Sequence, residues 1–396
     1  MRKLTFFMFI VLLMGITGYT IESGWSAETP GVTDTSIKLG AWIPLTGPIA
    51  VHGLAQKAGV DAFFGMINDK GGVKGRKINW IVEDNAYDPQ KTVAAARKLI
   101  ARDEIFAFVG CNGTAQSAAA FSFVLEESKV PIFIGQGGAL SWYNPSKPYL
   151  YGAMVVYEYQ AQVLGQWAAK EGTKKLLVVH SDPAAFENVA NNYKTGAESI
   201  NPNLTTTLMA VKLNTRDYVP IVLQIANAKP DAVGTVLPTG EVVALAKEMA
   251  RQNVKLPIYT YSPNVSFELI ELAGEAADGL RAVSYTVPPT IDTPAVAEYR
   301  SAMKQYVPDA KPDFQSLFTW AEAKVFVEAL NRIQGELTRE NLVASLNKMS
   351  NFETGILPPV TFNETNHMGV TGVQRVMVEK GGWKLIGGFV DATSKW

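Results

Sequence analysis

The sequence predicts an α/β protein of two similar lobes, each built on a parallel sheet with helices on its faces. Short apolar strands alternate with helical runs along most of the chain of 396 residues. The strands form two sets separated around 150–160, and the alternation restarts at Lys174. At about 150 residues per domain, the chain length also favours two domains.

The first unit of this alternation shows the pattern clearly. Residues 37–44 (IKLGAWIP) and 77–84 (KINWIVED) have the character of strands. Apolar residues at near-helical spacing predict a helix over 53–70, which a Gly-Gly pair ends, and Pro89 begins the next helix. The Gly-Gly turn is not a phosphate loop, because a Walker-type loop opens a helix, whereas here a strand follows.

Further apolar segments predict the remaining strands. They are 105–110, 131–135, 175–180, 231–237 and 256–261, followed by 358–362, 372–379 and 383–390 after a helical stretch at 314–333. Helical runs separate the earlier strands, as parallel pairing requires.

The composition excludes some classes of function. The 36 basic and 37 acidic residues give a net charge of -1, so we expect no nucleic-acid partner, which would need a basic face. The apolar fraction of 47% is ample for a core. The single cysteine, Cys111, has no partner for an internal disulfide.

No motif in the sequence indicates catalysis. The three histidines, His52, His180 and His367, are widely separated, and there is no G-x-S-x-G, no H-E-x-x-H and no nucleotide fingerprint. Cys111 has no evident paired base. We therefore expect no catalytic residue, no metal ligand and no cofactor.

The first residues, 1–27, have the pattern of a secretory signal peptide. Two basic residues precede an uncharged run over 4–21, and the small residues Ser26 and Ala27 follow, so cleavage is expected after one of these two. The alternative is a membrane anchor, since the run is near the lower limit for a spanning helix. The small-residue exit favours export to the periplasm, and no cysteine near Ala27 offers a lipid anchor.

Four segments carry a resemblance to a known family. They are IKLGAWIPLTGPIAVHG at 37–53, INDKGGVKGRKINWIVEDNAYDP at 67–89, FAFVGCNGTAQSAAA at 106–120 and VPIFIGQGGAL at 130–140. In order and spacing they resemble the periplasmic leucine/isoleucine/valine-binding protein family, the type I solute-binding proteins of ATP-driven (ABC) importers. The likeness extends over about the whole mature chain.

The resemblance implies a particular division of the chain. It implies two Rossmann-like lobes joined by three crossovers, with the ligand held in the cleft between them. One lobe would comprise 34–152 plus 285–358, and the other 153–284 plus 359–396.

Two loops are candidates for holding the ligand. Parallel sheets bind ligands beyond the carboxyl ends of their strands, where 111–116 (CNGTAQ) and 135–140 (GQGGAL) lie. Free amides at a helix start would suit an anion, and in the family these loops hold the ligand carboxylate. The candidates are Asn112, Gly113, Thr114, Gln136, Gly137 and Gly138. The alternative for each is ordinary turn and cap chemistry.

One position departs from the amino-acid binders. They carry an acid that pairs with the ligand ammonium where this chain has Ser262. A buried ammonium without a carboxylate is costly, so the departure favours an aromatic or other non-amino organic acid. Glu187 or Glu241 could replace the missing acid, which keeps leucine, isoleucine or valine, or an amide or urea, as the alternative ligand.

Aromatic residues near the cleft loops fit a flat, apolar ligand. Trp142, Phe186 and Tyr261 are the ones we select, because aromatic rings stack on such ligands, as in family members that bind benzoate-like or phenylpropenoid acids. The alternative is that the rings belong to the core. His52, at a position where relatives carry an aromatic, either donates to a ligand or caps the helix that follows.

The resemblance also implies partners. The ligand would pass to the membrane permease of an ABC importer, and the family default is a monomer. A sensory ligand-binding protein is the alternative of another class, but the chain shows neither tether nor output domain. Tyr87 stands where relatives often carry a cysteine that pairs with the Cys111 position, which accounts for the lone cysteine.

Overall fold

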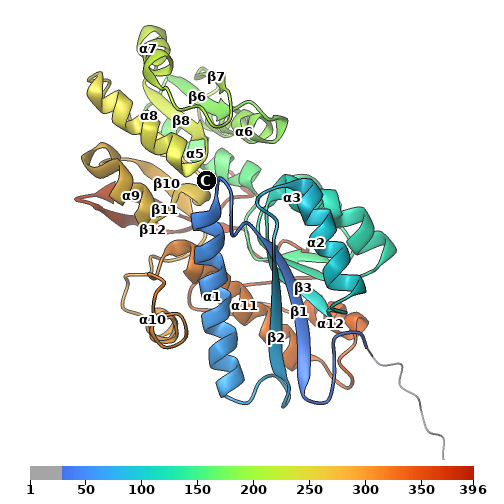
Figure 1. The fold of residues 1–396 in the computed structure, drawn as a ribbon. Helices are drawn as coiled ribbons and strands as arrows, with labels where there is room; N and C mark the ends of the chain where they lie inside the picture. The colour runs from blue at the N-terminus through green and yellow to red at the C-terminus, as the bar shows by residue number, and fades with distance from the viewer. Residues whose placement is uncertain (1–28) are drawn as a thin grey trace, which may run out of the picture.

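The computed structural model describes residues 29–396, so the predicted signal peptide and its cleavage site lie outside the described residues. Within this part the chain forms two lobes, one above the other in Figure 1, each around its own sheet. None of the helices in residues 29–396 combines the length and the apolar character that a bilayer crossing needs.

The strands divide into two sheets. The first sheet contains β1 (Ser36–Ile43), β2 (Lys77–Asp84), β3 (Ala107–Asn112), β4 (Ile132–Gln136) and β5 (Leu150–Gly152). The second contains β6 (Lys175–Ser181), β7 (Thr205–Val211), β8 (Ala232–Val236), β9 (Ile258–Thr260), β10 (Arg281–Ser284), β11 (Gly372–Glu379) and β12 (Gly382–Asp391).

Helices cover both sheets. They are α1 (Ala50–Asp69), α2 (Pro89–Ala101), α3 (Thr114–Phe121), α4 (Leu140–Tyr143), α5 (Tyr157–Lys170), α6 (Ala184–Ile200), α7 (Val219–Ala228), α8 (Thr239–Arg251), α9 (Phe267–Ala273), α10 (Pro294–Tyr306), α11 (Phe314–Arg332) and α12 (Arg339–Leu346). A π-helical segment, Ser122–Glu127, continues α3, and two short 3₁₀ helices span Ser262–Asn264 and Gly274–Ala277. Helix α2 begins as its sequence predicts, with Pro89 in its first turn and the Asp88 side chain accepting from the Lys91 amide at 2.9 Å.

The order of the strands matches an α/β fold. The first sheet runs β2-β1-β3-β4-β5 with every pair parallel. In Figure 1, α1 and α11 lie on one side of it and α2 and α3 on the other. The second sheet runs β12-β11-β10-β9-β8-β6-β7, and it is parallel except where β11 pairs with β10 and β12. The predicted two-lobed α/β class is therefore confirmed.

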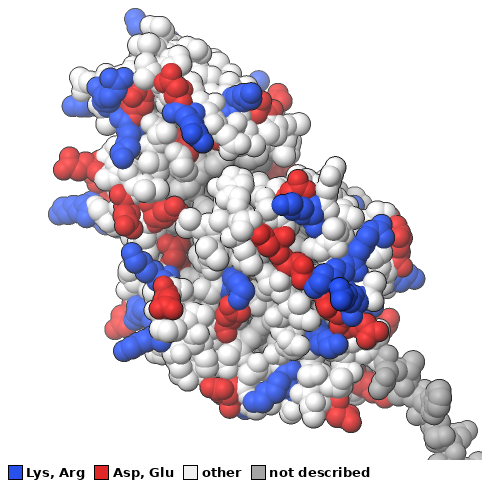
Figure 2. All heavy atoms as spheres, in the orientation of Figure 1, with Lys and Arg blue, Asp and Glu red and all other residues white. Residues whose placement is uncertain are grey.

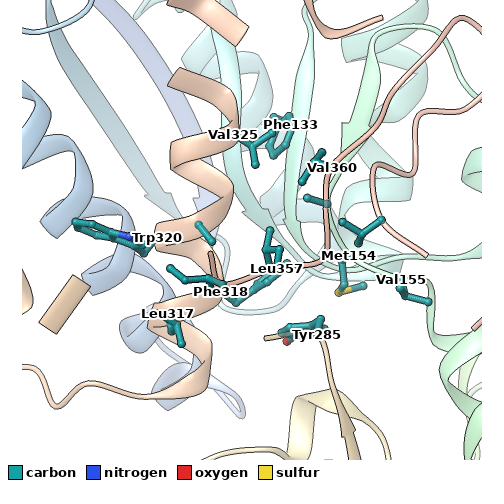
Figure 3. Close-up of a cluster of buried hydrophobic side chains, with 14 of the residues drawn as sticks. Phe133, Met154, Val155, Tyr285, Leu317, Phe318, Trp320, Val325, Leu357 and Val360 are labelled. Carbon is teal, nitrogen blue, oxygen red and sulfur yellow. The ribbon is translucent and has the colours of Figure 1, made fainter. Parts of the chain in front are cut away.

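The chain passes between the lobes three times, through a buried hydrophobic cluster. Figure 3 shows Met154 and Val155 of the first passage and Tyr285 of the second in this cluster, with Tyr285 next to Phe318 of α11. The Tyr285 and Phe318 rings lie 4.1 Å apart, centroid to centroid. Because residues of these passages belong to a buried cluster, a hinge motion there would turn about a well-packed core.

The third passage comes later than the sequence predicts. Residues 359–369 stay with the first lobe: Met368 bridges to Gly152 at the end of β5, and the Phe362 ring packs edge-on against Tyr151. The chain therefore reaches the second sheet only just before β11, and not at the boundary expected at 358/359.

Some strand predictions differ from the structure. Residues 358–362 form no strand, and only Val360 makes an isolated bridge, to Phe352. Strands β5, β7 and β10 were not among the strands predicted from the sequence. Strand β7 has an alternating but half-exposed pattern at the edge of its sheet, and β5 is very short, so neither carries the continuous apolar run of a central strand.

Candidate ligand-binding site

A cleft of about 1040 Å³ lies between the two lobes. From the first lobe it is lined by Pro48, Ile49, His52, Tyr87, Asn112, Gly113, Thr114, Ala115, Gln116 and Gln136. From the second lobe it is lined by Tyr157, Pro183, Ala185, Phe186, Val189, Leu213, Asn214, Thr215, Arg216, Val236, Pro238, Thr239, Gly240, Glu241, Ala244, Tyr261 and Pro263. These residues lie at or after the carboxyl ends of parallel strands, where α/β folds bind ligands.

The first lobe contributes the start of α3 to the cleft. The backbone of Gly113, at φ 105°, turns the chain from β3 into this helix. A Cβ here would lie 2.5 Å from Gln116 Oε1, so the turn requires glycine. The amides of Thr114, Ala115 and Gln116 are in the first turn, where no helical carbonyl can accept from them, and no acceptor elsewhere in residues 29–396 takes them.

The neighbouring loop holds this helix start in place. The Gly113 amide donates to Gln136 O at 2.7 Å, and the Gly138 amide donates to Thr114 Oγ1 at 3.2 Å. Since Thr114 Oγ1 accepts there, its own proton remains available to a ligand. The two predicted loops therefore form one unit at the first-lobe wall.

The second lobe brings further helix starts to the same cleft. Helix α6 follows Pro183 and α8 follows Pro238, and residues of both first turns line the wall. Helix α1 does the same from the first lobe, through Ile49 and His52. Helix N-termini carry partial positive charge, so their combined field favours an anionic group in the cleft.

Few formal charges line the cleft. Arg216 is the single basic residue that lines the cleft. Its side chain is exposed and forms no ion pair with another residue of 29–396. Glu241 is its one acid and is buried. The Glu241 carboxylate accepts from the Asn214 amide at 2.9 Å and from the Tyr218 hydroxyl at 2.8 Å, so both of its oxygens are engaged. Burial raises the pKa of Glu241 above its ordinary value, which these two hydrogen bonds partly offset.

Four aromatic rings line the cleft: Tyr87, Tyr157, Phe186 and Tyr261. Tyr157 and Tyr261 meet edge to face, with ring centroids 5.3 Å apart. Burial raises the pKa of the three tyrosines, so their hydroxyls are neutral at physiological pH. The rings offer apolar faces together with neutral hydroxyls.

The predicted site residues divide into two groups. His52, Asn112, Gly113, Thr114, Gln136, Phe186 and Tyr261 line the cleft. Gly137, Gly138, Trp142 and Ser262 do not. Gly137 and Gly138 support the loop from behind: a Cβ on Gly137 would meet Gly113, and one on Gly138 would meet the end of Met154.

Trp142 and Ser262 lie away from the cleft for different reasons. Trp142 is 3% exposed and packs edge-on against Phe121, with centroids 4.9 Å apart, so the core alternative holds for this ring. Ser262 is buried in the turn after β9, where its amide donates to Gln160 Oε1 at 3.1 Å. Its neighbours Tyr261 and Pro263 face the cleft instead.

The predicted amide groups are also partly committed. The Asn112 side chain donates to Gln56 Oε1 at 2.6 Å and is buried. The Gln136 side chain donates to Gln315 and to the Tyr285 hydroxyl in the second passage. These two residues therefore link the cleft wall to α1 and to the hinge, and the loops 111–116 and 135–140 offer a ligand mainly backbone amides and Thr114.

Several cleft residues were not predicted as ligand contacts. Tyr87 follows β2, and in place of a disulfide partner for the buried Cys111 it supplies a ring to the wall. Tyr157, Arg216 and Thr239 come from the start of α5, the loop after β7 and the start of α8. For Thr239 the signal was available, because it comes two residues after the strand predicted at 231–237.

On the face shown in Figure 2, basic and acidic side chains are interspersed over both lobes. This face therefore shows no large basic patch of the kind that nucleic acids require. Within residues 29–396 there is also no grouping of three or more His, Cys, Asp or Glu side chains placed to hold a metal ion.

Comparisons with known proteins agree with this geometry. Residues 36–382 match the family model described as "Periplasmic binding protein". The Leu/Ile/Val-binding protein homolog 7 of Brucella suis biovar 1 (strain 1330) is 26% identical over 319 residues, which cover 76% of this chain and 78% of the relative.

Two solved structures have the same fold. A fatty acid ABC transporter substrate-binding protein from Thermomonospora curvata superposes with a TM-score of 0.81 at 23% identity, covering 92% of this chain and 94% of that one. A branched chain amino acid ABC transporter from Thermus thermophilus with bound valine gives a TM-score of 0.81 at 18% identity, covering 91% and 97%. The family match spans most of the chain, and the resemblance found in the sequence is confirmed: the protein belongs to the periplasmic binding protein family, with the fold of its leucine/isoleucine/valine-binding members.

Proposed function

We propose that this protein is the periplasmic solute-binding component of an ABC importer and captures a small carboxylate-bearing ligand, favoured as an aromatic or other non-amino organic acid. The lobes close over the ligand by a hinge motion, and the closed form delivers it to a membrane permease. Closure is a population shift, and its extent is set by how much better the ligand binds the closed form.

One observation carries the proposal. The free amides at the start of α3 face a cleft with one exposed cation, Arg216, and one acid, Glu241, whose oxygens are both engaged. A carboxylate gains from helix amides and from a cation. An ammonium would need an acid that is free to pair with it, and Ser262 supplies none.

The aromatic part of the proposal rests on the walls of the cleft. Tyr87, Tyr157, Phe186 and Tyr261 line the cleft, and aromatic rings stack on flat ligands. The fold does not distinguish an organic acid from an amino acid as the ligand. One of the two similar structures is named as a fatty acid ABC transporter substrate-binding protein, and the other contains bound valine.

A branched-chain amino acid is the second candidate, and Glu241 is the observation that favours it. This acid lines the cleft, and a carboxylate oxygen with one hydrogen bond can still accept another. In that case Glu241 would take the place of the acid missing at Ser262.

A thermal-shift panel on mature protein that has been unfolded and refolded, to remove carried-over ligand, distinguishes the two. The panel contains benzoates, cinnamates and aliphatic acids beside leucine, isoleucine, valine, small amides and urea. A ligand at 100 times its Kd stabilises the folded state by about 2.7 kcal/mol, which gives a clear rise in Tm. We expect rises with the acids alone.

The matched variant is Glu241→Gln, which keeps the size of the side chain and removes its charge. If the ligand is a simple acid, its affinity should stay the same or rise, because a nearby negative charge is removed. A Tm rise with leucine or valine that Glu241→Gln abolishes would overturn the acid proposal and establish the amino-acid candidate.

A further inference from the structure

His52 reaches across the cleft from the first lobe to the second. It lies in the first turn of α1, and its Nε2 is 3.1 Å from Oγ1 of Thr239 at the start of α8. Both residues line the cleft. The question is which of the two atoms donates, because the answer fixes what the other ring nitrogen presents to a ligand.

The hydrogen-bond partners behind Thr239 settle the direction. Asn264 is fully buried, and its Nδ2 lies 3.0 Å from Leu237 O and 2.7 Å from Thr260 Oγ1. A backbone carbonyl only accepts, so the amide nitrogen of Asn264 must be on that side and Oδ1 on the other.

Asn264 Oδ1 then faces Thr239 Oγ1 at 2.8 Å, and the only proton between these two oxygens is that of the threonine hydroxyl. Thr239 therefore donates to Asn264 and turns a lone pair toward His52. The proton of the His52–Thr239 hydrogen bond must come from His52 Nε2.

A neutral imidazole carries one proton, so His52 Nδ1 is a bare acceptor. Burial lowers the pKa of His52 to about 4, which keeps the ring neutral at physiological pH. No group of residues 29–396 donates to Nδ1.

We propose that His52 Nδ1 reads a hydrogen-bond donor on the ligand, so that the cleft selects acids bearing a neutral hydroxyl over the same acids without one. This specificity rests on the proposed function and names the substrate class more narrowly. An acid without a hydroxyl would leave His52 Nδ1 without a hydrogen-bond donor in the closed cleft. A buried acceptor without a donor costs free energy, so this acid should bind more weakly.

A hydroxyl suits this position better than an ammonium. A neutral imidazole offers a cation no compensating charge, and the one acid lining the cleft, Glu241, already accepts from Asn214 and Tyr218. When a single acceptor is available, the free-energy cost of burying a hydroxyl group is far smaller than that of burying a cation.

The test compares matched acid pairs by calorimetry on refolded protein: 4-hydroxybenzoate with benzoate, 4-hydroxycinnamate with cinnamate, and hydroxylated with plain aliphatic acids. We expect the hydroxylated member of at least one pair to bind roughly tenfold tighter or more. Thr239→Ser keeps the hydroxyl that orients His52 and should keep this preference. Thr239→Val removes it, frees the ring to exchange tautomers, and should reduce the preference to about threefold or less.

A second measurement does not depend on the valine variant folding. Long-range ¹H–¹⁵N spectra of the protein with the tightest-binding acid report the tautomer of each histidine, and with three histidines in the sequence His52→Phe assigns the signals. We expect His52 to be neutral, with its proton on Nε2. A proton on Nδ1, or a charged ring at pH 7, overturns the inference.

The remaining outcomes separate the two proposals. If acids bind but no pair shows a hydroxyl preference, the inference fails and the proposed function stands. A preference that survives both Thr239→Val and His52→Phe also overturns it, because another residue then reads the hydroxyl. If none of the acids binds, the proposed function fails, and the inference with it.

Discussion

The start of α3 in the first lobe meets the cleft with backbone amides, whereas the second lobe meets it with side chains that differ in size and charge. At the first-lobe wall, the start of α3 is pinned through Gly113 and Thr114 to the loop after β4. The second-lobe wall includes the side chains of Phe186, Arg216 and Tyr261, which come from three separate segments. Backbone amides can bind an anionic group whatever side chains the sequence carries. The side chains of the second lobe can differ between proteins and so suit the non-anionic part of different ligands.

This difference gives the two walls distinct roles. Amides at a helix start recognise a carboxylate whatever is attached to it. Rings, one cation and His52 distinguish what is attached. Variants at the start of α3 should therefore weaken the binding of every acid, whereas variants of these side chains should change which acid binds best.

The largest loss is expected from Gly113→Ala. The added Cβ would lie 2.5 Å from Gln116 Oε1 at a φ of 105°, so the first turn of α3 must move. Three amides would be displaced at about 1 kcal/mol each, or roughly a hundredfold in affinity, measured by calorimetry with the tightest-binding acid.

The control is Gly75→Ala, which has a positive φ of 80° but nothing within 4 Å of the new Cβ. It should lose about 1 kcal/mol of stability through the same backbone strain and keep its affinity. Equal losses of affinity in both variants would show that strain, and not the amides of α3, explains the result.

Thr114→Ala should weaken acid binding by about 1–3 kcal/mol if the hydroxyl donates to a buried carboxylate. Thr114 Oγ1 also accepts from the Gly138 amide, so the loss includes some loosening of the loop. Thr114→Ser retains both hydrogen bonds and should bind nearly as wild type does. Unchanged affinity in the alanine variant would remove Thr114 from the site.

Arg216→Ala should cost about 1 kcal/mol, because the guanidinium is exposed and solvent screens its charge. The loss should shrink as salt is added. Arg251→Ala makes the same charge change on α8, where Arg251 pairs with Glu248 away from the cleft, and should leave affinity unchanged. A loss that salt does not reduce would argue against a charge contact.

The smallest effect on binding is expected from Glu322→Gln, which should act on stability instead. Glu322 is buried in α11, and burial raises its pKa well above the ordinary 4.5, which the Ala153 amide only partly offsets. Above pH 4.5 the unfolded chain ionises while the folded one does not, so the wild type loses stability as pH rises toward the folded pKa.

The glutamine variant avoids that loss. Its Tm should match that of the wild type near pH 4 and exceed it increasingly toward pH 7, as the difference in the free energy of unfolding grows by up to about 1.4 kcal/mol per pH unit. Melting curves across this range, with acid affinity at pH 7 measured in parallel, check the prediction. A pH-independent difference would mean that Glu322 is ionised in the fold.

The sequence by itself determined the lobes, the parallel strands and the first-lobe wall. Alternating apolar segments and the position of Gly113 after a strand are local signals, because the periodicity of a strand and the start of a helix depend on residues close in the sequence. The loops 111–116 and 135–140 were found from their place at strand ends together with the family resemblance, and Asn112, Gly113, Thr114 and Gln136 line the cleft.

Only the tertiary structure decided which side chains of those loops and of the second lobe face the cleft. Trp142 and Tyr87 are both aromatic and near strand ends, but Trp142 packs on Phe121 while Tyr87 turns to the cleft. Likewise, the proton on His52 depends on Asn264, more than two hundred residues away in sequence. Such contacts arise from the packing of distant segments, and no local pattern in the chain encodes which way a ring turns or which atom donates.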